Sequence, residues 1–262
     1  MLADETIRLA GGRQWRVFRG GSGTPLLWLH GLRGVDADDP LLAALGRTHA
    51  IIAPVAPGFA DLEEVAAIDN IHELALDYDD LLRGLKLGPL PIVGHSLGAM
   101  MAAEIAAHFP DRASRLVLLA PVGLWNDAYP VGDLFALPVA EMDRMLWHDT
   151  RARDAFAARL SGADAQKSQV EQILSVTRSI ASVTKFIWPI PDKGLAKRLH
   201  RIAAPTLVLF GAEDGFVPPR YAQDFAARIA RCETALVPGA GHMAPYEKTE
   251  AVAGLIARFL QS

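Results

Sequence analysis

A glycine-rich turn at residues 94–98, Gly-His-Ser-Leu-Gly, constrains the fold of this chain more than any other feature of its sequence. The short apolar run 90–93 precedes the turn, and the alanine-rich segment 99–108 follows it. Glycines flank the central residue of such a strand–turn–helix because a side chain there would collide with the neighbouring backbone. The pattern therefore predicts a buried strand, a sharp bend that lifts Ser96 above the strand end, and a helix that begins beside it.

Similar short apolar runs alternate with segments of helical periodicity elsewhere in the chain. Such runs lie at 26–29, 51–53, 116–120, 206–210 and 234–237. Runs this short with turn residues at their ends fit buried parallel strands. Asn70 is placed to cap a helix, with Glu73 three residues on to return the bond, and a final helix is expected over about 250–260. This alternation indicates an α/β fold with right-handed crossovers in a parallel sheet.

The middle of the chain departs from that alternation. Between 122 and 201 the sequence has no β-branched run bounded by turns, and helical stretches occur instead at 151–160 and 166–180. We therefore expect an α/β core formed by residues 1–121 and 202–262, interrupted by a helical cap at 122–201.

Composition and charge narrow the function classes. The 262 residues carry a formal net charge of −4, which does not favour the basic surface that nucleic-acid binding needs. The single cysteine, Cys232, excludes an internal disulfide and has no neighbours at metal-ligand spacing. The first residues lack the basic start and apolar stretch of a secretory signal, and the longest uncharged run, 87–103, is broken by prolines and glycines. We expect a cytoplasmic protein without a membrane or nucleic-acid partner.

Ser96 is the candidate nucleophile, because the strand–turn–helix context argues against a serine in an ordinary glycine-containing turn. The free N–H groups and the dipole of the following helix favour negative charge that develops beside it. A serine also needs a base and an orienting acid. The candidate base is His242, in the loop after the last predicted strand, and the candidate acid is Asp214, in the loop after the run 206–210. Open α/β sheets place their sites at such strand ends.

Rival residues exist for both partners of the serine. His30 also lies at a strand end, and its alternative role is to brace the loop by hydrogen bonding. Glu213 competes with Asp214, which by itself could be a loop-capping aspartate. His95 lies inside the turn, where we expect its backbone to matter more than its ring. The other five histidines lie within helices or away from strand ends, and they are His49, His72, His108, His148 and His200.

Taken together, these segments resemble the α/β-hydrolase superfamily from about Thr24 to the C-terminus. The resemblance rests on the His-Gly-x loop at 30–32, the Pro-Gly-aromatic loop at 57–59, Phe-Pro-Asp-Arg at 109–112, and the segment Gly-Ala-Gly-His-Met-Ala-Pro-Tyr-Glu at 239–247. The nucleophile, acid and base occur along the chain in the order Ser96, Asp214, His242, and this catalytic triad has the same order in that fold. The resemblance implies a mostly parallel eight-stranded sheet flanked by helices. Ala-Asp-Leu-Glu at 60–63 departs from the glycine and serine that many relatives have there.

The same resemblance implies how the site stabilises charge. Two backbone N–H groups, those of Leu32 and Leu97, would form the oxyanion hole, each contributing ~3–4 kcal/mol to the transition state. No metal and no cofactor is implied. A serine in the turn argues against relatives with an aspartate nucleophile, the haloalkane dehalogenases and epoxide hydrolases.

The cap residues bear on the substrate. Large apolar side chains in the cap are Trp125, Phe135, Met142, Met145, Trp147, Phe186 and Trp188. For each of them, packing in the cap's own core is favoured over lining a pocket. The residues expected to bind the substrate are Trp125 and Trp188 of the cap and Met243, which lies beside the base. These residues predict a small, largely apolar substrate, and the cap has no basic cluster that would favour a phosphorylated or highly anionic one.

The leading function is hydrolysis of a carboxylic ester through an acyl-enzyme on Ser96. Hydrolysis of carbon–carbon bonds in β-diketones or ring-cleavage products is an alternative, because it uses the same triad, and so is a cofactor-free perhydrolase. A non-catalytic ligand-binding protein on this fold is an alternative from another class. In every case the expected partner is a small molecule, and the protein is a monomer or homodimer.

Overall fold

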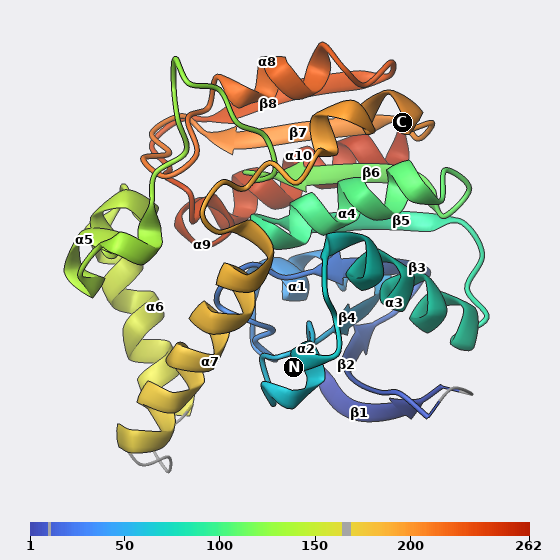
Figure 1. The fold of residues 1–262 in the computed structure, drawn as a ribbon, viewed down its shortest axis with the longest axis horizontal. Coiled ribbons are helices and arrows are strands. Elements are labelled where there is room, and N and C mark those ends of the chain that lie inside the picture. The colour runs from blue at the N-terminus through green and yellow to red at the C-terminus, as the bar shows by residue number, and fades with distance from the viewer. Residues whose placement is uncertain (10–11, 164–168) are drawn as a thin grey trace.

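The structure is a computed structural model that describes residues 1–9, 12–163 and 169–262. Within these residues, eight strands form one sheet in the order β1-β2-β4-β3-β5-β6-β7-β8 (Figure 1). The strands are β1 (Ala3–Arg8), β2 (Gln14–Gly21), β3 (Thr24–Leu29), β4 (His49–Pro54), β5 (Leu90–His95), β6 (Ala113–Leu119), β7 (Thr206–Gly211) and β8 (Cys232–Val237). Strand β2 runs antiparallel to β1 and β4, and all other pairs are parallel. The expected mostly parallel α/β sheet is confirmed.

Helices connect most of the parallel strands. They are α1 (Pro40–Leu45), α2 (Glu63–Ala66), α3 (Ile71–Gly84), α4 (Leu97–His108), α5 (Val139–Leu146), α6 (Thr150–Ala163), α7 (Gln169–Ile187), α8 (Tyr221–Ala226), α9 (Ala244–Glu247) and α10 (Thr249–Gln261). Short 3-10 turns are η1 (Leu134–Ala136), η2 (Leu195–Lys197) and η3 (Leu199–Arg201). In the part of the chain described, no helix is both long and apolar enough to cross a membrane.

The sheet is buried on both faces because its strand residues alternate between two cores. Leu27 and Leu29 of β3 pack into one core, whereas Leu26 and Trp28 pack into the other. Helices α3, α4 and α8 contribute to the first core, and α1 and α10 contribute to the second. This two-sided cover explains why the central strands read as continuous apolar runs in the sequence.

The predicted N-terminal cap of α3 forms with one difference. The side-chain oxygen of Asn70 accepts the N–H groups of His72 and Glu73 at 2.9 and 3.1 Å. The Glu73 carboxylate accepts the N–H of Asp69 at 2.6 Å, whereas the sequence predicted a bond back to Asn70. The helix end is therefore satisfied by the predicted pair, but the acid reaches one residue further upstream.

Helices α5, α6 and α7 lie beyond the end of the sheet where the parallel strands finish (Figure 1). The predicted helix 151–160 falls within α6. The predicted helix 166–180 corresponds to α7, although residues 166–168 lie outside the described residues. Contacts to the core include the Arg178 guanidinium on the carbonyl of Ala60 at 3.1 Å. The exact limits of core and cap stay a prediction.

Helix α4 lies unusually close to the backbone of β3. A Cβ atom added to Gly98 would overlap the carbonyl groups of Leu29 and His30. Because these are backbone atoms in a central strand and its following loop, they cannot move aside as a flexible side chain can. Glycine at 98 is therefore what lets the helix begin directly above the strand ends.

We predict that Gly98→Ala lowers the free energy of unfolding by about 3 kcal/mol, the upper end of the usual cost of overpacking, because the added methyl group overlaps fixed carbonyls. Gly254→Ala is the matched control: Gly254 lies inside α10 with nothing within 4 Å of its added Cβ. That substitution should raise stability by roughly 0.5–1 kcal/mol through helix propensity. Urea denaturation measures both, and equal effects would contradict the close approach.

Candidate active site

The predicted bend at Ser96 is present. Ser96 follows β5, serves as the N-cap of α4, and has φ 56° and ψ −116°. A positive φ is costly for a non-glycine residue and persists only where its surroundings enforce it. The Ser96 N–H donates to the carbonyl of Leu119 at 2.9 Å, and a Cβ on Gly94 would overlap Gly98. Backbone contacts on both sides thus hold the serine hydroxyl above the end of the sheet.

The structure brings Ser96, His242 and Asp214 together. The Nε2 atom of His242 lies 2.9 Å from the Ser96 hydroxyl oxygen, and its Nδ1 atom lies 2.8 Å from a carboxylate oxygen of Asp214. The second Asp214 oxygen accepts the N–H groups of Phe216 and Val217, both at 2.9 Å. All three side chains are buried. The carboxylate is thereby fixed toward the imidazole, and the imidazole toward the hydroxyl.

The rival residues brace loops. The Nε2 atom of His30 accepts the N–H of Ala56 at 2.8 Å, so its Nδ1–H donates to the carbonyl of Gly31 at 2.8 Å. Burial lowers the pKa of His30 to about 4, which keeps this ring neutral. The Glu213 carboxylate accepts the N–H of Ala240 at 3.1 Å, at the start of the histidine loop. Of the two acids, Asp214 is the one that contacts the imidazole.

The ring of His95 has a structural role that sequence reasoning missed. It donates a hydrogen bond through Nε2 to the backbone carbonyl of His242 at 2.9 Å. Burial, and then the positive charge that His242 would carry, lower the pKa of His95 to about 3. A neutral imidazole inside the turn therefore positions the backbone of the neighbouring histidine. The sequence analysis expected the His95 backbone to matter more than its ring, and the structure adds this contact of the ring.

Glu247 is a second buried group without a role in the sequence analysis. Its carboxylate accepts the N–H of Gly241 at 2.7 Å, and the N–H groups of His148 and Asp149 at 2.7 and 2.6 Å. Gly241 precedes His242, whereas His148 and Asp149 immediately precede α6. One carboxylate thus ties the histidine loop to the cap. The position of Glu247 in the family-like segment 239–247 was the signal in the sequence that could have pointed to this role.

A small cavity that opens to solvent lies in front of Ser96 and His242. Its apolar lining from the cap includes Leu134, Phe135, Leu146, Val183 and Ile187. The core adds Phe216, Met243 and the backbone loop that contains Leu32. Of the side chains expected to line the pocket, Met243 does so.

The two tryptophans expected at the pocket lie elsewhere. Trp125 is half-buried and its indole N–H donates to Asp127 at 2.8 Å. Trp188 is 52% exposed at the end of α7. Neither lines the cavity in front of Ser96. Their positions follow from the path of the cap backbone, which the sequence pattern did not give.

The two expected oxyanion donors lie on either side of the serine. Leu97 is the first residue of α4, so its N–H has no intrahelical acceptor. The loop with Leu32 lies against the turn, because a Cβ on Gly31 would be 3.0 Å from the Cβ of Ser96. Both residues thus lie next to the serine, and their role as donors to an oxyanion stays a prediction.

Comparisons with known proteins agree with this geometry. The model of the alpha/beta hydrolase family matches residues 20–255. The 2-hydroxymuconate semialdehyde hydrolase of Pseudomonas sp. (strain CF600) is 27% identical and aligns with 96% of this chain and 92% of its own. The sn-1-specific diacylglycerol lipase ABHD11 of Mus musculus is 26% identical over 73% of this chain and 65% of its own. The CarC serine hydrolase, involved in carbazole degradation, superposes with a TM-score of 0.78 at 20% identity, covering 100% and 99% of the two chains.

Glu247→Gln tests the tie between histidine loop and cap. An amide nitrogen cannot accept an N–H, so at least one of the three backbone donors loses its partner. We predict a loss of about 1–3 kcal/mol in the free energy of unfolding, with faster amide hydrogen exchange at Gly241.

The matched control is Glu250→Gln, because the Glu250 side chain is 83% exposed. This change should alter stability by less than about 0.5 kcal/mol and leave exchange at Gly241 unchanged. Equal effects of the two substitutions in urea denaturation would refute the bridging role of Glu247.

Proposed function

The chain belongs to the alpha/beta hydrolase family, and from that premise we propose that it is a serine hydrolase of carboxylic esters with small, largely apolar acyl groups. One observation carries the proposal: the Ser96 hydroxyl, 2.9 Å from the His242 Nε2 atom, faces a cavity with a largely apolar lining. An apolar lining favours an uncharged acyl group, because a charged one would lose its hydration without gaining partners.

Acylation of the serine follows from the distances in the site. His242 takes the hydroxyl proton at Nε2 as the Ser96 oxygen attacks the ester carbonyl carbon. Asp214 holds the Nδ1–H and stabilises the imidazolium that forms. The oxyanion receives hydrogen bonds from the backbone N–H groups of Leu32 and Leu97. Collapse of the tetrahedral intermediate passes the proton from His242 to the departing alkoxide, which leaves as the alcohol.

Hydrolysis of the acyl-enzyme repeats these steps with water. His242 accepts a proton from a water molecule as the water oxygen attacks the acyl carbon. The second tetrahedral intermediate then collapses, the bond to Ser96 breaks, and the proton returns from His242 to the serine oxygen. The products are a carboxylic acid and the free enzyme, so no external reagent other than water is consumed.

A second candidate is hydrolysis of a carbon–carbon bond in a ring-cleavage product. Two observations favour it: the similarity to a 2-hydroxymuconate semialdehyde hydrolase, and Arg33, the one Lys or Arg side chain among the described residues that line the cavity. Its guanidinium lies 3.3 Å from Asp143, so a substrate carboxylate would have to compete with that pair. Comparing kcat/KM for p-nitrophenyl butyrate and for a 2-hydroxy-6-oxo-dienoate separates the two functions.

We predict that Ser96→Ala lowers kcat for p-nitrophenyl butyrate by at least about 10⁴-fold while the protein stays folded. Folding should survive, because His242 is the one hydrogen-bond partner of the hydroxyl among the described residues and alanine keeps the Cβ atom. A fluorophosphonate probe should label the wild type and not the variant. Labelling of neither protein would favour a non-catalytic binding protein, and undiminished turnover in the variant would refute the nucleophile.

The acid is tested by comparing Asp214→Asn with Glu213→Gln. The asparagine amide can turn its N–H₂ toward Nδ1 of His242 and select the wrong tautomer. We therefore expect a loss of roughly 10³–10⁴-fold in kcat on the same ester. Glu213 bonds to Ala240 and not to the imidazole, so Glu213→Gln should cost less than about tenfold. Similar losses in the two variants would show that the acid is misassigned.

A further inference from the structure

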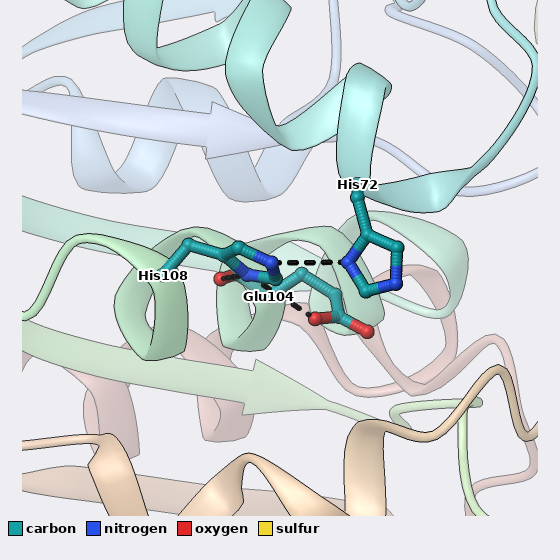
Figure 2. Close-up of side chains that lie close together, drawn as sticks. All are labelled: His72, Glu104 and His108. Carbon is teal, nitrogen blue, oxygen red and sulfur yellow. Dashed lines mark hydrogen bonds and ion pairs between the residues drawn. The ribbon is translucent and has the colours of Figure 1, made fainter.

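A cluster of two histidines and a glutamate joins α3 to α4 away from the cavity. His72 is the second residue of α3, His108 is the last residue of α4, and Glu104 lies one turn earlier on α4. Figure 2 shows the two imidazole rings directed toward each other with the carboxylate beside them. One possible ligand atom from each residue lies within 4.8 Å of the others. Glu104 is fully buried, and the histidines reach solvent.

The hydrogen bonds of the rings leave lone pairs facing the space between them. Nδ1 of His108 lies 2.9 Å from the backbone carbonyl of Glu104, so that nitrogen carries the proton. In the neutral ring, Nε2 of His108 is then an acceptor, and it lies 3.0 Å from Nδ1 of His72.

The separation of these nitrogens suits two ligands of one cation. Zinc–imidazole bonds are about 2.0–2.1 Å long, so two nitrogens of a tetrahedral zinc site lie about 3.3–3.4 Å apart, within about 0.4 Å of the separation found here. The same distance also fits a direct hydrogen bond from His72 to His108. A cation between the two rings and a direct hydrogen bond are therefore alternatives for this pair. The carboxylate of Glu104, the third residue of the cluster, favours the cation.

Glu104 supplies negative charge at the cluster. Its two oxygens accept the Arg198 guanidinium at 2.9 and 2.6 Å, and one of them lies 3.5 Å from Nδ1 of His108. A carboxylate has about four lone-pair positions, so it can keep Arg198 and still coordinate an ion. The cluster also stands at the C-terminal end of α4, where the helix dipole favours positive charge.

We propose that His72, His108 and Glu104 bind a divalent late first-row transition-metal ion such as Zn²⁺, with water completing its coordination. Two imidazoles and one carboxylate suit zinc, nickel or copper ions, whereas calcium and magnesium prefer oxygen ligands alone. Helix α4 has 12 residues and is about 18 Å long, which separates the cluster from Ser96. The ion therefore joins the start of α3 to the end of α4 and takes no part in the chemistry at the serine.

The experiment titrates untagged protein with ZnCl₂ alone in a calorimeter at pH 7.5. The wild type should bind one Zn²⁺ per chain, and zinc at a hundredfold excess over its Kd should raise Tm by roughly 5–10 °C. Substitutions His72→Gln and His108→Gln should each weaken binding more than about tenfold, because even indirect partners of a metal ligand contribute that much. MgCl₂ should give neither heat nor a Tm shift.

The matched control is His49→Gln, because His49 is a partly exposed histidine on β4 that bonds to Thr48 and lies outside the cluster. It should keep wild-type zinc binding. Absence of zinc binding by the wild type would show that the pair is a hydrogen bond and overturn the proposal. Unchanged binding in both His72→Gln and His108→Gln would overturn it equally. If one of these variants does not fold, the other decides.

Discussion

The contact between the start of α4 and the backbone of β3 is the constraint on which the site depends. Gly98 leaves no room for a side chain above the Leu29 carbonyl, and this contact holds the chain in a bend at Ser96 with a positive φ. The bend places the hydroxyl above the sheet and aims the first N–H groups of α4 at the same point. The contact at Gly98 thus determines both the position of the nucleophile and the position of the N-terminal end of α4, which favours negative charge.

Three acids around the histidine loop hold it in place, of which Asp214 and Glu247 are buried and Glu213 is exposed. Asp214 uses one oxygen on the imidazole and the other on two backbone N–H groups, whereas Glu213 and Glu247 bond to backbone alone. The neighbouring rings of His30 and His95 stay neutral, because burial lowers the pKa of each. The His242–Asp214 pair is therefore the one place in this cluster of rings where positive charge on an imidazole has a carboxylate partner.

The sequence predicted the parts of the fold that rest on local rules. The central strands and the bend were predictable because burial on both faces requires apolar runs and close approach requires glycine. The antiparallel strands β1 and β2 went unpredicted, since β1 is mostly exposed and β2 mixes exposed and buried residues, so that neither has a continuous apolar run. The meeting of Ser96, Asp214 and His242 followed from chain order and strand ends. The bridge made by Glu247 and the positions of Trp125 and Trp188 could not, because they depend on where the cap backbone passes.

The bridge from Glu247 to the cap has a consequence for how such enzymes diversify. Cap residues form much of the apolar lining of the cavity, and the same segment supplies the two N–H groups of His148 and Asp149 that the Glu247 carboxylate holds. An insertion exchanged between homologues, in nature or in the laboratory, would alter selectivity without disturbing the base only if it offered equivalent donors at that point. The lining of the cavity and the orientation of the base are thus coupled through one segment. Exchange of cap segments downstream of Asp149 would leave the two donors to Glu247 in place.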